Sequence, residues 1–333
     1  MNNTRLLLKS RPDGRLGPEH FDLRDEQLGS LTDGKARVRV LYVSLDPAMR
    51  GWVSASTDSY LPPVPLGDTM RSLGVGVVEE SKSDAYQVGD WVTGMTGWTK
   101  FLDVAPGDLS VVPQLASIED YVGILGLPGA TAWHGLVVEG QAKAGETLCV
   151  TGAAGSVGSL VGQIGKALGL RVIGIAGTQE KCDWLVDELG FDAALNYRTD
   201  DLSKGLKEFA PNGINLHFEN VGGEPFNAAL KNMAPFGRMI FCGFISVYNG
   251  EAKDTPPEMT AIVRKRLTLK GYVMTDHFDT FPAIFQELGK LMMAGKLRYR
   301  LDVTEGLENA PSVFNKLFDG TNKGKLAIKV SDL

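Results

Sequence analysis

Two patterns of hydrophobic and polar residues follow one another along the chain. Up to about residue 125, short alternating stretches such as 38–43 and 75–79 predict half-buried β-strands separated by turns. From about residue 145, apolar runs alternate with amphipathic segments of helix length, beginning with 147–151 and 156–168. Such alternation predicts βαβ units, which build a buried parallel sheet with right-handed crossovers. The predicted fold class is therefore α/β, with a doubly wound Rossmann sheet beside a β-rich domain.

The strands and helices predicted after residue 168 indicate where the two domains begin and end. After residue 168, strands are predicted at 171–176, 193–196, 214–219, 238–242 and 268–273, and helices at 180–189, 202–209, 226–233 and 278–294. The tail after about residue 297 alternates like the first part, and we expect it to return there. We therefore predict a discontinuous β-rich domain of residues 1–125 and 298–333, and a Rossmann domain of residues 126–297.

Composition narrows the classes of function. A chain of 333 residues with 43% hydrophobic and 22% charged residues is expected to fold on its own into two domains. Its 40 acidic residues outnumber its 34 lysines and arginines, which disfavours a nucleic-acid partner. No apolar run approaches the length that spans a membrane, and nothing resembles a signal peptide. The three cysteines form no CxxC pair, so we expect no disulfide framework and a cytoplasmic protein.

A glycine-rich turn follows the first strand of the second part. The sequence Gly152-Ala153-Ala154-Gly155-Ser156-Val157-Gly158 comes between strand 147–151 and an amphipathic helix. Small residues let backbone N–H groups approach a pyrophosphate, and the helix N-terminus supplies partial positive charge. Such a motif is a strong signal only inside a repeated β/α pattern, which is its context here. We therefore predict a dinucleotide site that includes Gly155, Ser156, Val157 and Gly158.

The end of the second strand predicts which dinucleotide is bound. In proteins that bind NAD, an acidic residue at this place bonds the ribose hydroxyl. Here the strand ends in Ala176-Gly177-Thr178-Gln179, which is neutral, and Lys181 follows. Small neutral residues leave room for a 2′-phosphate, and the lysine supplies a compensating charge. NADPH or NADP⁺ is therefore the predicted cofactor, with a solvated lysine in the first helical turn as the alternative interpretation.

Other common chemistries find no support in the sequence. The four histidines are scattered and form neither an HExxH motif nor a Cys/His spacing suited to zinc. The sequence contains no complete P-loop and no GxSxG elbow. We therefore predict no metal site and no serine hydrolase activity.

Several stretches resemble one family of oxidoreductases. They are Asp46-Pro47-Ala48-Met49-Arg50-Gly51, Tyr60-Leu61-Pro62-Pro63, Gly129-Ala130-Thr131-Ala132, Glu219-Asn220-Val221-Gly222-Gly223, Cys242 to Asn249, and Asn322-Lys323-Gly324-Lys325. They are similar to the medium-chain dehydrogenase/reductase superfamily, in the zinc-free branch of prostaglandin, alkenal/one and curcumin reductases. The resemblance covers nearly the whole chain and implies that the β-rich domain is GroES-like. Where zinc-dependent members carry ligands, this chain has Val43-Ser44-Leu45-Asp46-Pro47 and Leu73-Gly74-Val75-Gly76, so the resemblance implies no zinc.

The resemblance also implies a set of cofactor contacts. Lys181 and Tyr197 would meet the phosphate on the adenosine ribose, and Asn220 the pyrophosphate or the nicotinamide ribose. The run from Cys242 to Tyr248 would pass the nicotinamide. The remaining implied contacts are Thr131, Gly243, Ile245, Ser246, the backbone of Tyr272, Val273 and Met274 at the carboxamide, and Asn322 from the tail. Glu219 replaces an Asp of the family, an exchange that we expect to be neutral.

The implied activity is reduction of an α,β-unsaturated ketone or aldehyde by NADPH. Hydride added to the β-carbon leaves an enolate, whose oxygen needs a hydrogen-bond donor before a proton reaches the α-carbon. Tyr248 is the first candidate donor, because it follows a strand end that should abut the nicotinamide, and Tyr60 on the proline-rich loop 60–65 is the second. A packing role for either tyrosine, and donation by a ribose hydroxyl or a water, stay open.

Two other functions also stay open. A quinone reductase or a zinc-free alcohol dehydrogenase would differ only in its pocket, and a protein that binds NADPH without catalysis would share every motif. The family further implies a homodimer that pairs the edge strands at 268–273. The predicted partner is a small-molecule α,β-unsaturated carbonyl compound, with no nucleic acid and no membrane.

Overall fold

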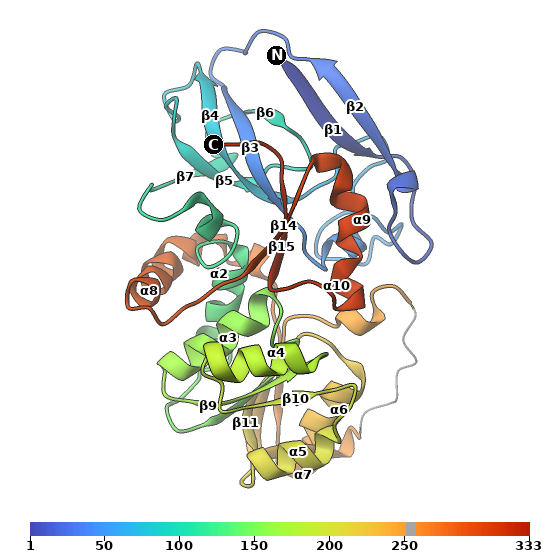
Figure 1. Ribbon diagram of the computed structural model, residues 1–333, viewed down its shortest axis with the longest axis vertical. Coiled ribbons are helices and arrows are strands. Elements are labelled where there is room, and N and C mark those ends of the chain that lie inside the picture. Colours follow the sequence, from blue (N-terminus) through green and yellow to red (C-terminus); the bar gives the residue numbers. More distant parts are fainter. Residues whose placement is uncertain (251–257) are drawn as a thin grey trace. The chain divides into compact units, whose positions relative to one another are not determined.

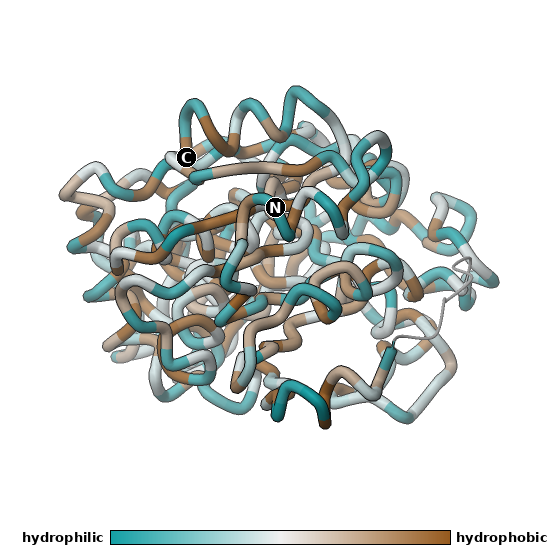
Figure 2. Tube along the Cα trace, turned by 90° about the horizontal axis from the view of Figure 1, so that it is seen from below, coloured by the Kyte–Doolittle hydropathy of each residue, from teal (hydrophilic) through white to brown (hydrophobic). Residues whose placement is uncertain are grey.

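The computed structural model of the chain describes residues 1–250 and 258–333. The chain divides into two compact units, each built on its own main sheet (Figure 1). Unit 1 contains Met1–Val122 and Leu301–Leu333, and unit 2 contains Gly123–Arg300. Hydrophobic and hydrophilic stretches alternate along the trace (Figure 2), as expected of strands and helices that each turn one side toward a core.

Unit 2 contains a parallel six-stranded sheet in the order β10-β9-β8-β11-β12-β13. Its strands are β8 Thr147–Thr151, β9 Arg171–Ala176, β10 Ala193–Asn196, β11 Ile214–Glu219, β12 Met233–Phe241 and β13 Thr268–Gly271. The chain moves outward from β8 to β10, returns to β11 beside β8, and moves outward again to β13. This order is that of a doubly wound Rossmann fold, so the predicted fold class is confirmed. The order reverses between β8 and β11, where such folds bind ligands at the carboxyl ends of the strands.

Helices precede, connect and follow these strands. They are α2 Leu127–Trp133, α3 Ser156–Ala167, α4 Gln179–Asp183, α5 Leu202–Phe209, α6 Gly223–Asn232, α7 Thr260–Lys265 and α8 Phe281–Met293. Two of them, α2 and α4, continue into π-helical segments at His134–Glu139 and Trp184–Glu188. The sequence predicted neither α2 nor α7. The former is almost entirely buried and has no amphipathic period, and the latter has only six residues, too few to display one.

The start of β12 differs from the prediction. The strand begins at Met233 instead of residue 238, and the preceding helix α6 ends at Asn232. Pro235 and Gly237 interrupt the strand pattern, and Phe236 between them has a positive φ of 62°. The ladder with β11 is irregular here, because its register shifts between Ile214 and Leu216. An irregular strand of this kind gives no alternating signal in the sequence.

Unit 1 contains a sheet in the order β14-β15-β3-β4-β5-β7, with β6 also paired to β3, and a separate hairpin of β1 and β2. Its strands are β1 Asn2–Leu8, β2 Phe21–Gln27, β3 Ala36–Ser44, β4 Leu73–Ser81, β5 Trp91–Met95, β6 Phe101–Val104, β7 Leu109–Val112, β14 Leu301–Glu305 and β15 Lys325–Lys329. Short helices lie at α1 Met49–Trp52, α9 Ala310–Phe314 and α10 Lys316–Asp319. The tail strand β15 pairs antiparallel with β3, placing Ala327 opposite Ser44.

The strand β3 is buried along almost its whole length, which corrects the prediction of a half-buried strand. Arg37 is only 5% exposed, and its guanidinium Nε donates to Asp103 Oδ1 at 2.7 Å. Arg39 likewise pairs with Glu79 on the neighbouring strand β4. The polar positions that alternate with apolar ones here therefore form ion pairs between strands, with Arg37 buried and the Arg39–Glu79 pair partly exposed.

Candidate active site

The two strand ends at the reversal point of the unit 2 sheet are tied together by hydrogen bonds. Thr151 ends β8, and Asn220 follows the last residue of β11. The Asn220 backbone N–H donates to Thr151 Oγ1 at 2.8 Å, and its side-chain Nδ2 donates to the Thr151 carbonyl at 2.7 Å. The predicted contact Asn220 therefore lies at the crevice where a dinucleotide binds in this fold.

The glycine-rich turn leads from β8 into α3. Gly152 adopts a φ of +58°, and the Gly155 N–H donates to the Gly152 carbonyl at 2.9 Å. A Cβ at Gly158 would lie 2.4 Å from the Gly152 carbonyl oxygen and 2.9 Å from the Ala153 Cα, so only glycine fits there. Ser156 and Val157 form the first turn of α3, whose N–H groups have no intrahelical acceptor. Among the described residues, the buried Ser156 Oγ has no hydrogen-bond partner. Such a hydroxyl is suited to forming a hydrogen bond with a ligand.

Lys181 and Tyr197 lie at the ends of β9 and β10. Thr178 caps α4, because its Oγ1 accepts from the Lys181 backbone N–H at 3.3 Å, and this places Lys181 in the first helical turn. The Tyr197 N–H donates to the Ala176 carbonyl at 3.0 Å. Its ring lies close to Gly177, where a Cβ would be 2.9 Å from the tyrosine hydroxyl. A side chain at this position would therefore displace the exposed Tyr197 ring.

Sequence reasoning missed Arg198 in the same region. Its guanidinium carbon lies 5.6 Å from the centroid of the Tyr197 ring, in a cation–π contact. In Rossmann folds an arginine near the end of the second strand accommodates a 2′-phosphate, and Arg198 follows the neighbouring strand β10. The sequence feature that could have indicated Arg198 is its position directly after Tyr197, which was itself a predicted cofactor contact.

The run from Cys242 to Tyr248 follows β12 and folds against the loop after β11. The N–H groups of Cys242 and Gly243 donate to the Glu219 carbonyl at 2.9 and 3.2 Å. Further along, Ile245 N donates to the Asn220 carbonyl at 3.1 Å, and Ser246 N donates to the Val221 carbonyl at 3.0 Å. The Ser246 Oγ is buried and, within the part of the chain that the structure describes, has no hydrogen-bond partner. The structure thus brings this predicted run beside Asn220.

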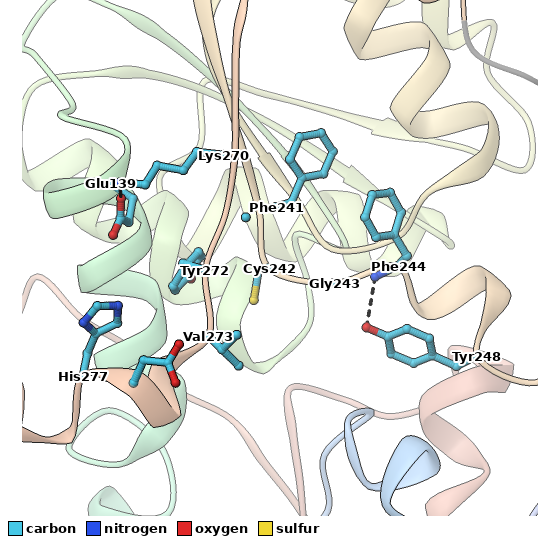
Figure 3. Close-up of a pocket in the computed structure, with 12 residues that line it drawn as sticks. Glu139, Phe241, Cys242, Gly243, Phe244, Tyr248, Lys270, Tyr272, Val273 and His277 are labelled. Carbon is cyan, nitrogen blue, oxygen red and sulfur yellow. Dashed lines mark hydrogen bonds and ion pairs between the residues drawn. The ribbon is translucent and has the colours of Figure 1, made fainter. Parts of the chain in front are cut away.

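The Tyr248 hydroxyl is fixed by the backbone of this run. The Phe244 N–H donates to Tyr248 Oη at 3.1 Å, drawn as a dashed line in Figure 3. Because the phenol oxygen accepts this bond, its own hydrogen is left to donate to another group. Burial raises the pKa of Tyr248 above its ordinary value of 10, although the Phe244 N–H acts in the opposite direction. The phenol is therefore protonated at neutral pH.

A pocket of about 660 Å³ opens at the carboxyl ends of β12 and β13, all of it within unit 2 (Figure 3). Cys242, Gly243, Phe244 and Tyr248 line one part, and Tyr272, Val273 and the charged side chains of Glu139 and Lys270 line another. Burial raises the pKa of the Cys242 thiol to about 11. This thiol is therefore protonated at neutral pH and does not act as a nucleophile.

Tyr272 and Thr131 contact each other inside unit 2. Tyr272 Oη donates to the Thr131 carbonyl at 2.8 Å, and Thr131 Oγ1 donates to the Leu127 carbonyl at 2.7 Å. The carbonyls of Val273 and Met274 accept from Asp276 N at 3.2 Å and His277 N at 3.1 Å, and Met274 is buried. These predicted cofactor contacts therefore already make bonds within the unit. Their role toward a cofactor stays a prediction.

Tyr60 and Asn322 belong to unit 1. Tyr60 is half exposed on the loop 60–65, and this loop is held by Arg71 Nη1, which donates to the Pro62 carbonyl at 2.9 Å. The Arg71 guanidinium also lies over the Trp52 ring, 5.6 Å from its centroid. Asn322 is buried, and its Nδ2 donates to the Gly324 carbonyl at 2.9 Å. That these two residues reach the cofactor stays a prediction.

Sequence and structure comparisons give consistent matches over the chain. Residues 4–112 match the family model of the N-terminal domain of oxidoreductase, and residues 156–290 match that of zinc-binding dehydrogenase. The chain is 41% identical over 339 residues to the NADPH-dependent curcumin reductase of Escherichia coli, covering 99% of this chain and 97% of that protein. It is 39% identical to the NADP⁺-dependent 2-alkenal reductase of Nicotiana tabacum, covering 88% and 87% of the two chains.

Solved structures match the fold over the same extent. CurA of Vibrio vulnificus in complex with NADPH superimposes with a TM-score of 0.93 at 36% identity, covering 99% of this chain and 100% of that chain. Among the described residues, no helix has the length and apolar character needed to cross a membrane.

The name of the second family model implies zinc, and unit 2 contains one group of side chains that could be tested for it. Within the described residues, the ligand atoms of His134, Glu139 and His277 lie within 4.8 Å of one another. Glu139 Oε1 already lies 3.2 Å from His134 Nε2, and its other oxygen pairs with the Lys270 ammonium. The two imidazoles stack with centroids 4.1 Å apart and planes 27° apart. Because zinc binds an imidazole nitrogen in the plane of the ring, stacked rings do not converge on one ion, and this group does not fit zinc.

The segment after β3 in unit 1 does not fit zinc either. Lys325 is fully buried there, and its Nζ donates to the Leu45 carbonyl at 3.0 Å and pairs with the Asp46 carboxylate. An ammonium group thus already compensates the carboxylate, and a divalent cation beside it would be repelled. The same carboxylate also accepts a hydrogen bond from the Ser44 hydroxyl.

Proposed function

Because the chain belongs to the medium-chain dehydrogenase/reductase family, in its branch of enone and alkenal reductases, we propose that it reduces α,β-unsaturated ketones and aldehydes to their saturated carbonyl compounds. The protein is an NADP-dependent oxidoreductase that acts on carbon–carbon double bonds. The observation that carries the proposed substrate class is the Tyr248 hydroxyl, which lines the pocket and accepts from a backbone N–H.

NADPH, when bound, supplies the hydride that adds to the β-carbon of the substrate. The residues that would hold it are the turn 155–158 at the pyrophosphate and Lys181 and Tyr197 at the 2′-phosphate. Asn220 would hold the pyrophosphate or the nicotinamide ribose. The free hydroxyls of Ser156 and Ser246 fit such a ligand, because each is buried and has no partner among the described residues.

Tyr248 supports the reaction by stabilising the charge that develops on the substrate. Addition of hydride makes the carbonyl oxygen negative, and a positioned O–H stabilises that charge without a metal ion. The backbone bond from Phe244 fixes the phenol oxygen, so the hydroxyl needs little reorganisation when the charge develops. Tyr60 is the second candidate donor, and a ribose hydroxyl or a water remains an alternative source of the α-proton.

Removal of the Lys181 ammonium tests the choice of cofactor. Lys181→Ala is expected to raise the Michaelis constant for NADPH about tenfold, the factor for one hydrogen bond to a charged group, and to leave that for NADH unchanged. The control is Lys207→Ala, which removes an exposed lysine on α5 and should change neither constant. Equal effects of Lys181→Ala on the two cofactors would contradict the 2′-phosphate contact.

Product analysis separates this proposal from its rivals. NADPH absorbance is followed with an enal, an enone, a quinone and a simple aldehyde in the presence of EDTA, and the products are identified by mass spectrometry. A saturated ketone or aldehyde is the expected product. A reduced quinone or an alcohol as the main product would favour a quinone reductase or a zinc-free alcohol dehydrogenase, and binding of NADPH without turnover would favour a non-catalytic protein.

Three further features belong to the proposal. We propose a zinc-independent reaction, since neither group of polar side chains described above fits zinc. We propose a homodimer, because the strand β13 ends the sheet and three of its four residues are exposed. A cytoplasmic location agrees with three cysteines that are all free thiols.

A further inference from the structure

A carboxylate that the sequence analysis gave no role lies below the crevice of unit 2. Glu219 is the last residue of β11, and its side chain and that of His217 are both fully buried. Glu219 Oε2 lies 2.7 Å from His217 Nε2. A buried carboxylate is retained only where several donors compensate its lost hydration, so its bonds indicate what it holds in place.

The other oxygen of Glu219 accepts three hydrogen bonds. Thr151 Oγ1 donates to it at 2.8 Å, the Gly222 N–H at 2.8 Å and the Val221 N–H at 2.5 Å. Burial by itself raises the pKa of Glu219, but the bonds from His217 and from the two backbone N–H groups outweigh burial and lower it. The side chain is therefore an ionised acceptor, and an ionised acceptor makes stronger hydrogen bonds than a neutral one.

Through these bonds, one side chain connects three strand ends. Thr151 at the end of β8 donates to Glu219 and accepts from the Asn220 N–H. The loop 220–222 then accepts the N–H groups of Ile245 and Ser246, which follow β12. Gly222 adopts a left-handed φ of +85°, a conformation that its bond to the carboxylate helps to maintain. Loss of the carboxylate would leave two buried N–H groups without their acceptor.

We propose that Glu219 is a positioning residue for the cofactor, which fixes the loop 220–222 in its binding conformation before NADPH arrives. The proposal rests on the proposed function, in which Asn220 contacts the pyrophosphate or the nicotinamide ribose and the run 242–248 contacts the nicotinamide. A loop that is already ordered loses little conformational entropy when the ligand binds. The affinity for NADPH should therefore be higher when the loop 220–222 is held in its binding conformation. The effect should be confined to the nicotinamide half, since Lys181 and Tyr197 lie on other strand ends.

The test compares two ligands on one conservative variant. In Glu219→Gln the side chain keeps its size and loses its charge. The Kd for NADPH is expected to rise about tenfold, as for loss of one hydrogen bond to a charged group, while the Kd for adenosine 2′,5′-bisphosphate, which lacks the nicotinamide half, stays within about twofold. The kcat at saturating NADPH should change much less than the KM for NADPH, because Glu219 touches no reacting atom.

The control is a partly buried carboxylate at the opposite end of the same sheet, Glu146, whose side chain is 17% exposed. Glu146 precedes β8 and pairs with Arg238 Nη2 at 2.5 Å. Glu146→Gln should lower the Tm in the same way as Glu219→Gln and leave the Kd for NADPH unchanged. If Glu219→Gln does not fold, Thr151→Val tests the same connection, because it removes the hydroxyl that bridges Glu219 and Asn220. This variant should raise the Kd for NADPH and leave the Kd for adenosine 2′,5′-bisphosphate almost unchanged.

Two results would overturn the proposal. One is a Kd for NADPH in the variant within about twofold of the wild-type value, which would mean that the loop does not depend on the carboxylate. The other is an equal loss of affinity for both ligands, which would indicate a general structural role. Failure of the proposed function is a separate result, because it would appear in the wild-type protein as absence of NADPH binding or of enone reduction.

Discussion

Changing Tyr248 to Phe is expected to lower the turnover of an enone at least about tenfold, with little change in the Kd for NADPH. The variant keeps the ring against the run after β12 and loses only the hydroxyl that would stabilise the enolate oxygen. Stopped-flow decay of NADPH absorbance gives the rate of the hydride step, and fluorescence titration gives the affinity.

The pH dependence of the wild-type protein adds a second measurement. The donor is the protonated phenol, so its contribution is present below its pKa and is lost as the pH rises through it. Because burial raises that pKa above 10, the contribution of Tyr248 should be retained from neutral pH to about pH 9 and decline only in stronger alkali. The Phe variant should lack this alkaline decline.

A matched variant controls for loss of a buried hydroxyl. The Tyr86 hydroxyl in unit 1 donates to the Leu109 carbonyl at 2.9 Å, so Tyr86→Phe is the same chemical change at a structural position. It should lower the Tm and leave turnover as it is. Full activity in Tyr248→Phe would remove this residue from the mechanism and leave Tyr60, a ribose hydroxyl or a water as the donor.

Gly158→Ala is expected to raise the Kd for NADPH and to lower the Tm of the protein. The new methyl group would lie 2.4 Å from the Gly152 carbonyl oxygen, so either α3 or the glycine-rich turn must move. Overpacking of this kind costs about 1–3 kcal/mol, which corresponds to a fall in Tm of roughly 3–10 °C. Displacement of the turn should also raise the Kd for NADPH by more than about tenfold, because we propose that the turn and the first N–H groups of α3 bind the pyrophosphate.

The control for this variant is a glycine with free space around it. Gly289 lies within α8, and a Cβ there would meet no atom within 4 Å. Gly289→Ala should leave the affinity unchanged and raise the Tm slightly, since alanine is the better helix former. Calorimetry and NADPH titration of both variants check the pair. Wild-type affinity in Gly158→Ala would show that the turn does not contact the cofactor.

The sequence predicted most of the fold of unit 2 because its buried strands and amphipathic helices alternate regularly. It failed where burial or irregular geometry hides the period, as in α2 and at the start of β12. In the candidate site, the family resemblance implied that Asn220 and the run from Cys242 to Tyr248 both contact the cofactor, and the structure brings the two segments together. The role of Glu219 could not be predicted, because Thr151 contacts it across 68 residues of chain.

The two segments of unit 1 have a consequence for synthesis on the ribosome. The central strand β3 emerges early, but β15, which covers one of its edges, is made almost 300 residues later, with Ala327 opposite Ser44. Unit 2 lies between them in one continuous stretch and can fold while β3, already paired with β4 and β6, still lacks a partner along one edge at residues 42–44. A nascent chain must therefore protect that part of the edge from other chains until β15 has been made.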